Sequence, residues 1–116
     1  AHIMLPLSTE AANPSENKRR YADTGIAELL ALMKSKGANI QAVVAKIAGG
    51  AQMFATNSSV FNIGERNVNA VKKVLESYKI PIIAEQTGEN YGRTVFFDSS
   101  TGLMQVKSAS KNVIVV

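Results

Sequence analysis

The strongest constraint on the fold is a pair of segments in which apolar residues recur at helical spacing. Between them lies the short apolar run 40–48, which predicts a strand with two apolar faces at the centre of a sheet. Asp23 or Thr24 is expected to cap the first helix and Asn62 the second, and Gly37 is the expected C′ residue of the first. The apolar positions are Ile26, Leu29, Leu30 and Met33 in the first helix, and Val68, Val71, Val74, Leu75 and Tyr78 in the second.

The other apolar segments are short and bounded by turn-forming residues, which is typical of strands. The chain opens with an apolar run closed by Pro6, which predicts the tail of a buried strand, and residues 99–102 predict a hairpin turn. The predicted strands are 1–5, 40–48, 82–85, 94–98, 103–107 and 112–116. Their order with the helices predicts an α+β fold in a single domain, residues 1–116, with a mixed β-sheet core and two main helices packed on its outside.

Composition excludes several classes of protein. The chain has 116 residues, of which 46% are hydrophobic and 19% charged, as expected for one folded domain. No apolar run reaches the roughly 18 residues that span a bilayer, and no signal peptide is visible, so we expect a cytoplasmic protein without membrane insertion. With no cysteine and one histidine, the chain holds no disulfide, no thiolate site and no histidine cluster for a metal. We expect no cofactor.

The net charge of +4 could favour acidic partners. The basic residues cluster only at 18–20, and no aromatic side chains accompany them as a stacking platform. We therefore expect no nucleic-acid partner.

Three features are candidates for chemistry, each with a structural alternative. Gly49 and Gly50 either end a strand where backbone passes close to another segment, or border a site; they lack the spacing of a phosphate loop. Residues 63–67 place polar groups at a helix N-terminus, which is either a capped helix or an anion site. His2, the chain's one histidine, is either a general base or a hydrogen-bonded side chain at a strand edge. The residue types alone do not separate these alternatives.

Five short motifs in order resemble the CheD family, the chemoreceptor glutamine deamidases of bacterial and archaeal chemotaxis. The resemblance runs from His2 to about Lys107, nearly the whole chain. The motifs are 2–6 (HIMLP), 21–24 (YADT), 45–54 (AKIAGGAQMF), 63–67 (IGERN), and 84–85 (AE) with 88–90 (GEN) and 92–93 (GR).

The resemblance implies a Cys-His-Thr catalytic site in which His2 matches the histidine. The family's cysteine and threonine lie upstream of that histidine and have no counterpart here, so we expect a missing N-terminal segment. Without a thiol the chain alone should be inactive, since neither Ser58 nor Ser59 sits in a matching motif. We also expect a sheet edge and apolar side chains near Ile3 and Leu5 to be exposed.

The activity implied is hydrolysis of receptor glutamine side chains to glutamate through a cysteine thioester. Residues Gly49, Gly50 and Ala51 are expected to contact the substrate. The implied partners are the cytoplasmic helices of chemoreceptors and the CheC phosphatase. The alternative is an inactive CheD-like module that docks on a chemotaxis partner such as CheC.

Overall fold

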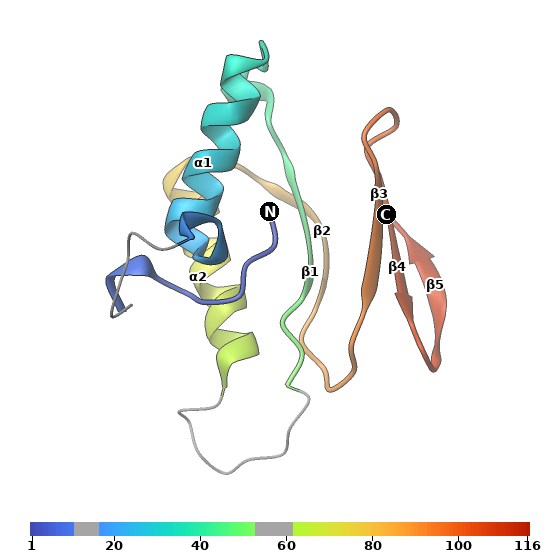
Figure 1. Ribbon diagram of the computed structural model, residues 1–116. Helices are drawn as coiled ribbons and strands as arrows, with labels where there is room; N and C mark the ends of the chain where they lie inside the picture. Colours follow the sequence, from blue (N-terminus) through green and yellow to red (C-terminus); the bar gives the residue numbers. More distant parts are fainter. Residues whose placement is uncertain (11–16, 53–61) are drawn as a thin grey trace.

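The computed structural model describes residues 1–10, 17–52 and 62–116, which form two long helices and five strands (Figure 1). Three short 3-10 helices accompany them. The helices are α1 (Ala22–Ser35) and α2 (Ile63–Ser77); the strands are β1 (Ala45–Gly49), β2 (Ile82–Thr87), β3 (Thr94–Asp98), β4 (Leu103–Ser108) and β5 (Lys111–Val115).

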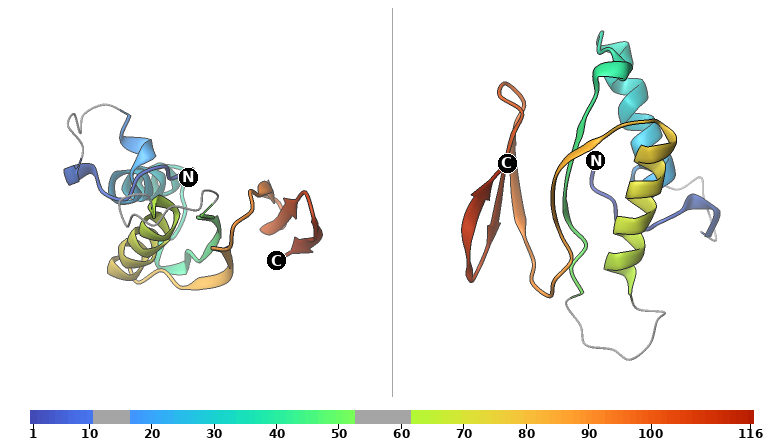
Figure 2. Two further views of the ribbon diagram at one scale, coloured as in Figure 1. Left: turned by 90° about the horizontal axis from the view of Figure 1, so that it is seen from below. Right: turned by 180° about the vertical axis from the view of Figure 1, so that it is seen from behind.

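The elements form three layers. α1 and α2 lie on one side of a parallel sheet of β1 and β2, and an antiparallel sheet in the order β3-β4-β5 lies on the other side (Figures 1 and 2). The expected α+β class with two main helices is confirmed. The five strands are divided between a parallel and an antiparallel sheet, because α2 makes the crossover that a parallel pair requires while short turns join β3, β4 and β5.

The helices supply the apolar core. Ile26 and Leu30 of α1 pack with Leu75 of α2 and with Ile80 just beyond it. Two residues predicted on these buried faces are instead exposed: Leu29 at 38% and Tyr78 at 43%. Ile26 and Leu30, one turn apart, already fill the contact with α2, and Tyr78 stands at the C-cap of α2, beyond its last turn.

The predicted helices are present and Asn62 stands at the N-cap position of α2 as predicted, but none of the predicted residues makes a capping side-chain hydrogen bond. Neither Asp23 nor Thr24 caps α1: the Asp23 carboxylate accepts hydrogen bonds from Ser8, and the Thr24 hydroxyl donates to a backbone carbonyl of the preceding turn. Asn62 makes no side-chain cap on α2. Gly37 does follow the end of α1 with a left-handed φ of 94°, as predicted.

The strand predicted over 40–48 is shorter than expected. Residues Ile40–Ala42 form a 3-10 turn, and β1 begins only at Ala45. Within the described residues β1 pairs with β2 alone, and its five residues are half-buried, so it is an edge strand and not a central one. Its other edge pairs with no strand in residues 1–10, 17–52 and 62–116.

The C-terminal hairpin is confirmed. β3 and β4 pair with Val95 opposite Val106 and Phe97 opposite Met104, and β5 continues the sheet beyond β4. The Asp98 carboxylate accepts from the Ser100 N–H and hydroxyl in the turn, which is the local hydrogen bonding that aspartate gives to turns.

The predicted opening strand is wrong. Ala1–Met4 lie in no strand, and Leu5 makes a single parallel bridge with Tyr21 at the start of α1. Ile3 and Leu5 are half-buried, while Met4 is 46% exposed. In the part of the chain that the structure describes, neither helix has the length and apolar character needed to span a membrane.

Candidate active site

A cavity of about 600 Å³ opens between the N-terminal segment, the unpaired edge of β1, α2 and the antiparallel sheet. His2, Gly49 and Gly50 all line it, although 46 residues separate His2 from the nearer of the glycines. Ala51, the third predicted substrate contact, is not part of the lining; its carbonyl faces Gly64 of α2. The structure thus brings three of the four predicted site residues to one cavity.

The turn at Gly49 and Gly50 is fixed by a close approach of two backbones. Both residues adopt left-handed φ values, 103° and 68°, which glycine reaches without strain. A Cβ on Gly50 would lie 2.3 Å from a methyl carbon of Val68, and one on Gly64 would lie 2.5 Å from the Gly50 carbonyl oxygen. The two alternatives for these glycines therefore coexist, because a strand ends against a helix and the same turn borders the cavity.

The helix N-terminus at residues 63–67 faces protein backbone. The carbonyl oxygens of Gly50 and Ala51 lie against Gly64 in its first turn. Carbonyl oxygens at this end complement the positive end of the helix dipole. The structural alternative is thus favoured, because backbone of residues 50–51 lies against the first turn of this helix.

His2 is exposed, and the segment that carries it is held by contacts to both helices. The N–H groups of Met4 and Leu5 donate to the Arg20 carbonyl at 2.8 and 3.0 Å. Gly25 in α1 makes room for this segment, because a Cβ there would lie 3.0 Å from the terminal methyl of Ile3. The imidazole is therefore presented by extended chain and not by a helix or a paired strand.

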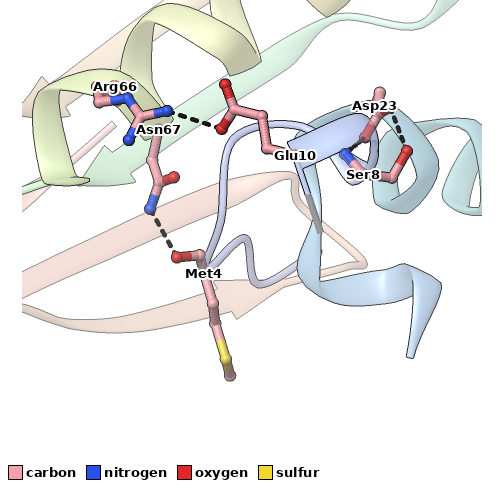
Figure 3. Close-up of polar contacts among 6 residues, drawn as sticks. All are labelled: Met4, Ser8, Glu10, Asp23, Arg66 and Asn67. Atoms are coloured by element: carbon pink, nitrogen blue, oxygen red, sulfur yellow. Dashed lines mark hydrogen bonds and ion pairs between the residues drawn. The ribbon is translucent and has the colours of Figure 1, made fainter. Parts of the chain in front are cut away.

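Three polar contacts complete the attachment, and Figure 3 shows them together. The Asn67 side-chain nitrogen donates to the Met4 carbonyl at 3.1 Å. The Ser8 N–H and hydroxyl donate to the two carboxylate oxygens of Asp23 at 3.0 and 2.7 Å. The third contact, an Arg66–Glu10 ion pair of 2.7 Å, has both side chains over 40% exposed and contributes little to stability.

The Asp23–Ser8 contact depends on the ionisation of the Asp23 carboxyl group. Partial burial disfavours the ionised Asp23 carboxylate and is the largest single effect, but the hydrogen bonds from Ser8 and from the backbone of Thr24 and Asp23 together outweigh it. The pKa of Asp23 is lowered as a result, and the ionised form is the one that holds the segment in place.

Sequence reasoning did not single out five polar residues that line the cavity: Lys46, Asn67, Thr87, Arg93 and Thr94. The Lys46 ammonium donates to the carbonyls of Gly102 and Val116 at 2.6 and 2.7 Å and so joins β1 to the antiparallel sheet. The Arg93 guanidinium lies 4.5 Å from the Tyr91 ring centroid and donates to the Gly88 carbonyl. Lys46, Asn67 and Arg93 lie within motifs that carry the resemblance, which is the one signal that pointed to them.

The lining determines which chemistry the cavity supports. Lys46 and Arg93 supply positive charge, and no carboxylate of the described residues lines the cavity. Histidine is the side-chain type suited to proton exchange near neutral pH, and His2 is the one histidine in the lining. The fold and cavity therefore define an α+β protein with an imidazole at a cationic, glycine-bordered site.

Comparison with known proteins places this fold in a family. A family model described as CheD chemotactic sensory transduction matches residues 4–108, beginning two residues after His2. The chain belongs to the CheD family.

Two relatives illustrate the similarity. A "Probable chemoreceptor glutamine deamidase CheD" of Caldanaerobacter subterraneus is 51% identical over 114 residues, 97% of this chain and 70% of the relative. The "Chemoreceptor glutamine deamidase CheD" of Halalkalibacterium halodurans is 44% identical over 110 residues, 93% of this chain and 68% of the relative. The chain thus spans about 70% of the length of such relatives.

Proposed function

We propose that this protein is a protein-glutamine deamidase that converts glutamine side chains on the cytoplasmic helices of chemoreceptors to glutamate. The observation that carries the proposal is the meeting of His2 with Gly49 and Gly50 at one cavity in a chain of the CheD family. The names of the relatives give the reaction and the substrate. A cytoplasmic location follows from the proposed substrate.

The proposed reaction needs a thiol, which must come from outside these 116 residues because they contain no cysteine. His2 takes the proton of that thiol, and the thiolate adds to the carboxamide carbon of the glutamine. The tetrahedral adduct collapses with cleavage of the C–N bond, and the His2 imidazolium protonates the departing ammonia. His2 then removes a proton from water, which attacks the thioester and releases glutamate with the regenerated thiol.

The turn at Gly49 and Gly50 is the proposed contact for the substrate backbone or carboxamide. Glycine there leaves main chain open at the cavity, so a substrate can approach it closely. Ala51, the residue after this turn, remains in the proposed contact, although it does not line the cavity and its carbonyl lies against Gly64 of α2.

The test is His2→Ala in the complete, cysteine-bearing enzyme, with ammonia release from a receptor fragment as the measurement. Loss of a general base lowers turnover roughly a hundred- to ten-thousand-fold, and loss of thiol activation adds to this. Circular dichroism should show an unchanged fold, because the His2 side chain is exposed. Wild-type turnover in the variant would make His2 a structural histidine and remove the proposal.

The second candidate is a CheD-like module that docks on a partner such as the CheC phosphatase without catalysis. Ammonia release by the complete protein separates the two. Release that requires both His2 and a thiol supports the deamidase. CheC binding without any release supports the module.

A further inference from the structure

The position of His2 depends on the two peptide units that flank Met4. On one side the Met4 N–H donates to the Arg20 carbonyl before α1, at 2.8 Å. On the other side the Met4 carbonyl accepts from the Asn67 side chain in α2, at 3.1 Å. Figure 3 shows the Asn67 amide pointing at Met4 from the helix. The chain is therefore fixed between two helices, two residues from the imidazole.

The Asn67 amide leaves one atom without a partner. A carbonyl only accepts hydrogen bonds, so the Asn67 amide nitrogen must face Met4, and the amide oxygen faces away. That oxygen is buried and has no hydrogen-bond partner among the described residues. A buried acceptor without a donor is destabilising, so a purely structural role does not account for an asparagine at this position.

The same helix face also sets the position of the glycine turn. Asn67 and Val68 lie three and four residues after Gly64, so both share a face of α2 with it. Gly64 and Val68 are the residues against which Gly50 packs, and Asn67 is the residue that holds Met4. One rigid element therefore fixes the base on one side of the cavity and the glycine turn on the other.

We propose that Asn67 is a positioning residue for the deamidation, which sets the place of the His2 imidazole through the Met4 carbonyl. This inference rests on the proposed function. Asn67 itself takes no part in proton transfer. A proton-transfer group must lie within hydrogen-bond reach of its target, and a displacement of about 1 Å can cost roughly a hundredfold in rate.

The experiment compares Asn67→Asp and Asn67→Ala with the matched control Asn69→Asp in the complete enzyme. Aspartate has the shape of asparagine but no N–H to donate, and alanine tests the loss of the contact without adding charge. Asn69 is exposed, lies two residues further along the same helix and does not line the cavity. We expect kcat for ammonia release to fall by roughly a hundredfold in both Asn67 variants, with KM unchanged.

Two further readouts separate positioning from loss of the fold. The thermal midpoints of both Asn67 variants should stay close to that of the control, and the backbone N–H of Met4 and Leu5 should exchange with deuterium faster than in wild type. Turnover like that of Asn69→Asp would overturn the inference. So would a fall in kcat that only accompanies a matching fall in the thermal midpoint. If the wild-type enzyme releases no ammonia, the proposed function fails at that first step, before the variants are compared.

Discussion

The backbones of Gly50 and Gly64 meet so closely that neither residue has room for a Cβ atom. A Cβ on Gly64 would clash with main chain, 2.5 Å from the Gly50 carbonyl oxygen. A Cβ on Gly50 would lie 2.3 Å from a Val68 methyl carbon and 3.0 Å from the Gly64 carbonyl oxygen. Main chain cannot rotate away as a side chain does, so this contact fixes the end of β1 against the start of α2. Because Gly50 lines the cavity, this contact also fixes one side of the cavity.

The first prediction is that Gly64→Ala destabilises the protein, although alanine is normally the better helix residue by about 1 kcal/mol. The added methyl must displace the Gly50 carbonyl, and overpacking of this kind costs about 1–3 kcal/mol. Urea unfolding measures the change. The control is Asn69→Ala, at an exposed position further along the same helix. This variant should be neutral or slightly stabilising. Equal stability of the two variants would contradict the close contact.

The second prediction concerns Lys46, which ties β1 to the antiparallel sheet through two carbonyls. Lys46→Met keeps most of the apolar stem but loses both charged hydrogen bonds. We expect a loss of about 1.5–3 kcal/mol in the free energy of unfolding, the usual range for a hydrogen bond to a charged group. The control is Lys73→Met on the exposed side of α2. A loss no larger than in the control would mean that the two sheets are held together by other contacts.

The third prediction is a pH dependence of stability that comes from Asp23. Its pKa in the folded protein lies below the ordinary value of 3.8, so its contribution to stability is fully present above that value. The contribution is lost as the pH falls through the folded pKa. Protonation removes the negative charge that strengthens the two hydrogen bonds from Ser8. Thermal midpoints measured from about pH 6 down to pH 2 should fall less steeply in Asp23→Asn than in wild type.

Ser8→Ala provides the cross-check on this pH dependence, since it removes the hydroxyl donor and leaves the Ser8 N–H in place. The acid sensitivity of Ser8→Ala should lie between those of wild type and Asp23→Asn. The double variant should match Asp23→Asn alone, because the two residues share one interaction. Additive losses in the double variant would show that Ser8 and Asp23 do not stabilise one another.

Local patterns predicted the elements whose stabilising contacts are close in sequence. Both helices and the C-terminal hairpin follow from apolar spacing and turn residues within each segment. The cap of α1 was predicted wrongly because Asp23 is engaged by Ser8, 15 residues away, before it can cap its own helix. The opening run was predicted as a strand from its apolar composition alone. Composition does not reveal whether a neighbouring strand pairs with the run, and none of the described residues does so.

The site was predicted only in part for the same reason. His2, Gly49 and Gly50 came from the resemblance to the CheD family, and the structure places them at one cavity. Asn67 reaches Met4 across 63 residues of sequence and Lys46 reaches Val116 across 70, and no local pattern encodes a contact at such separations. Ser58, Ser59 and the end of the 45–54 motif lie outside the described residues.

The division into two sheets has a consequence for the order in which the molecule folds. β3, β4 and β5 are neighbours in sequence, so their pairing closes only short loops, whereas the Lys46 contacts close loops of 56 and 70 residues. We expect the antiparallel sheet to be largely formed in the folding transition state and the Lys46 contacts to form after it. Mutational φ-values should then be high at Val106 and near zero for Lys46→Met, and the reverse order would refute this. On this order the cavity is assembled last, so a slow or faulty final step would leave a chain with its secondary structure in place and no site.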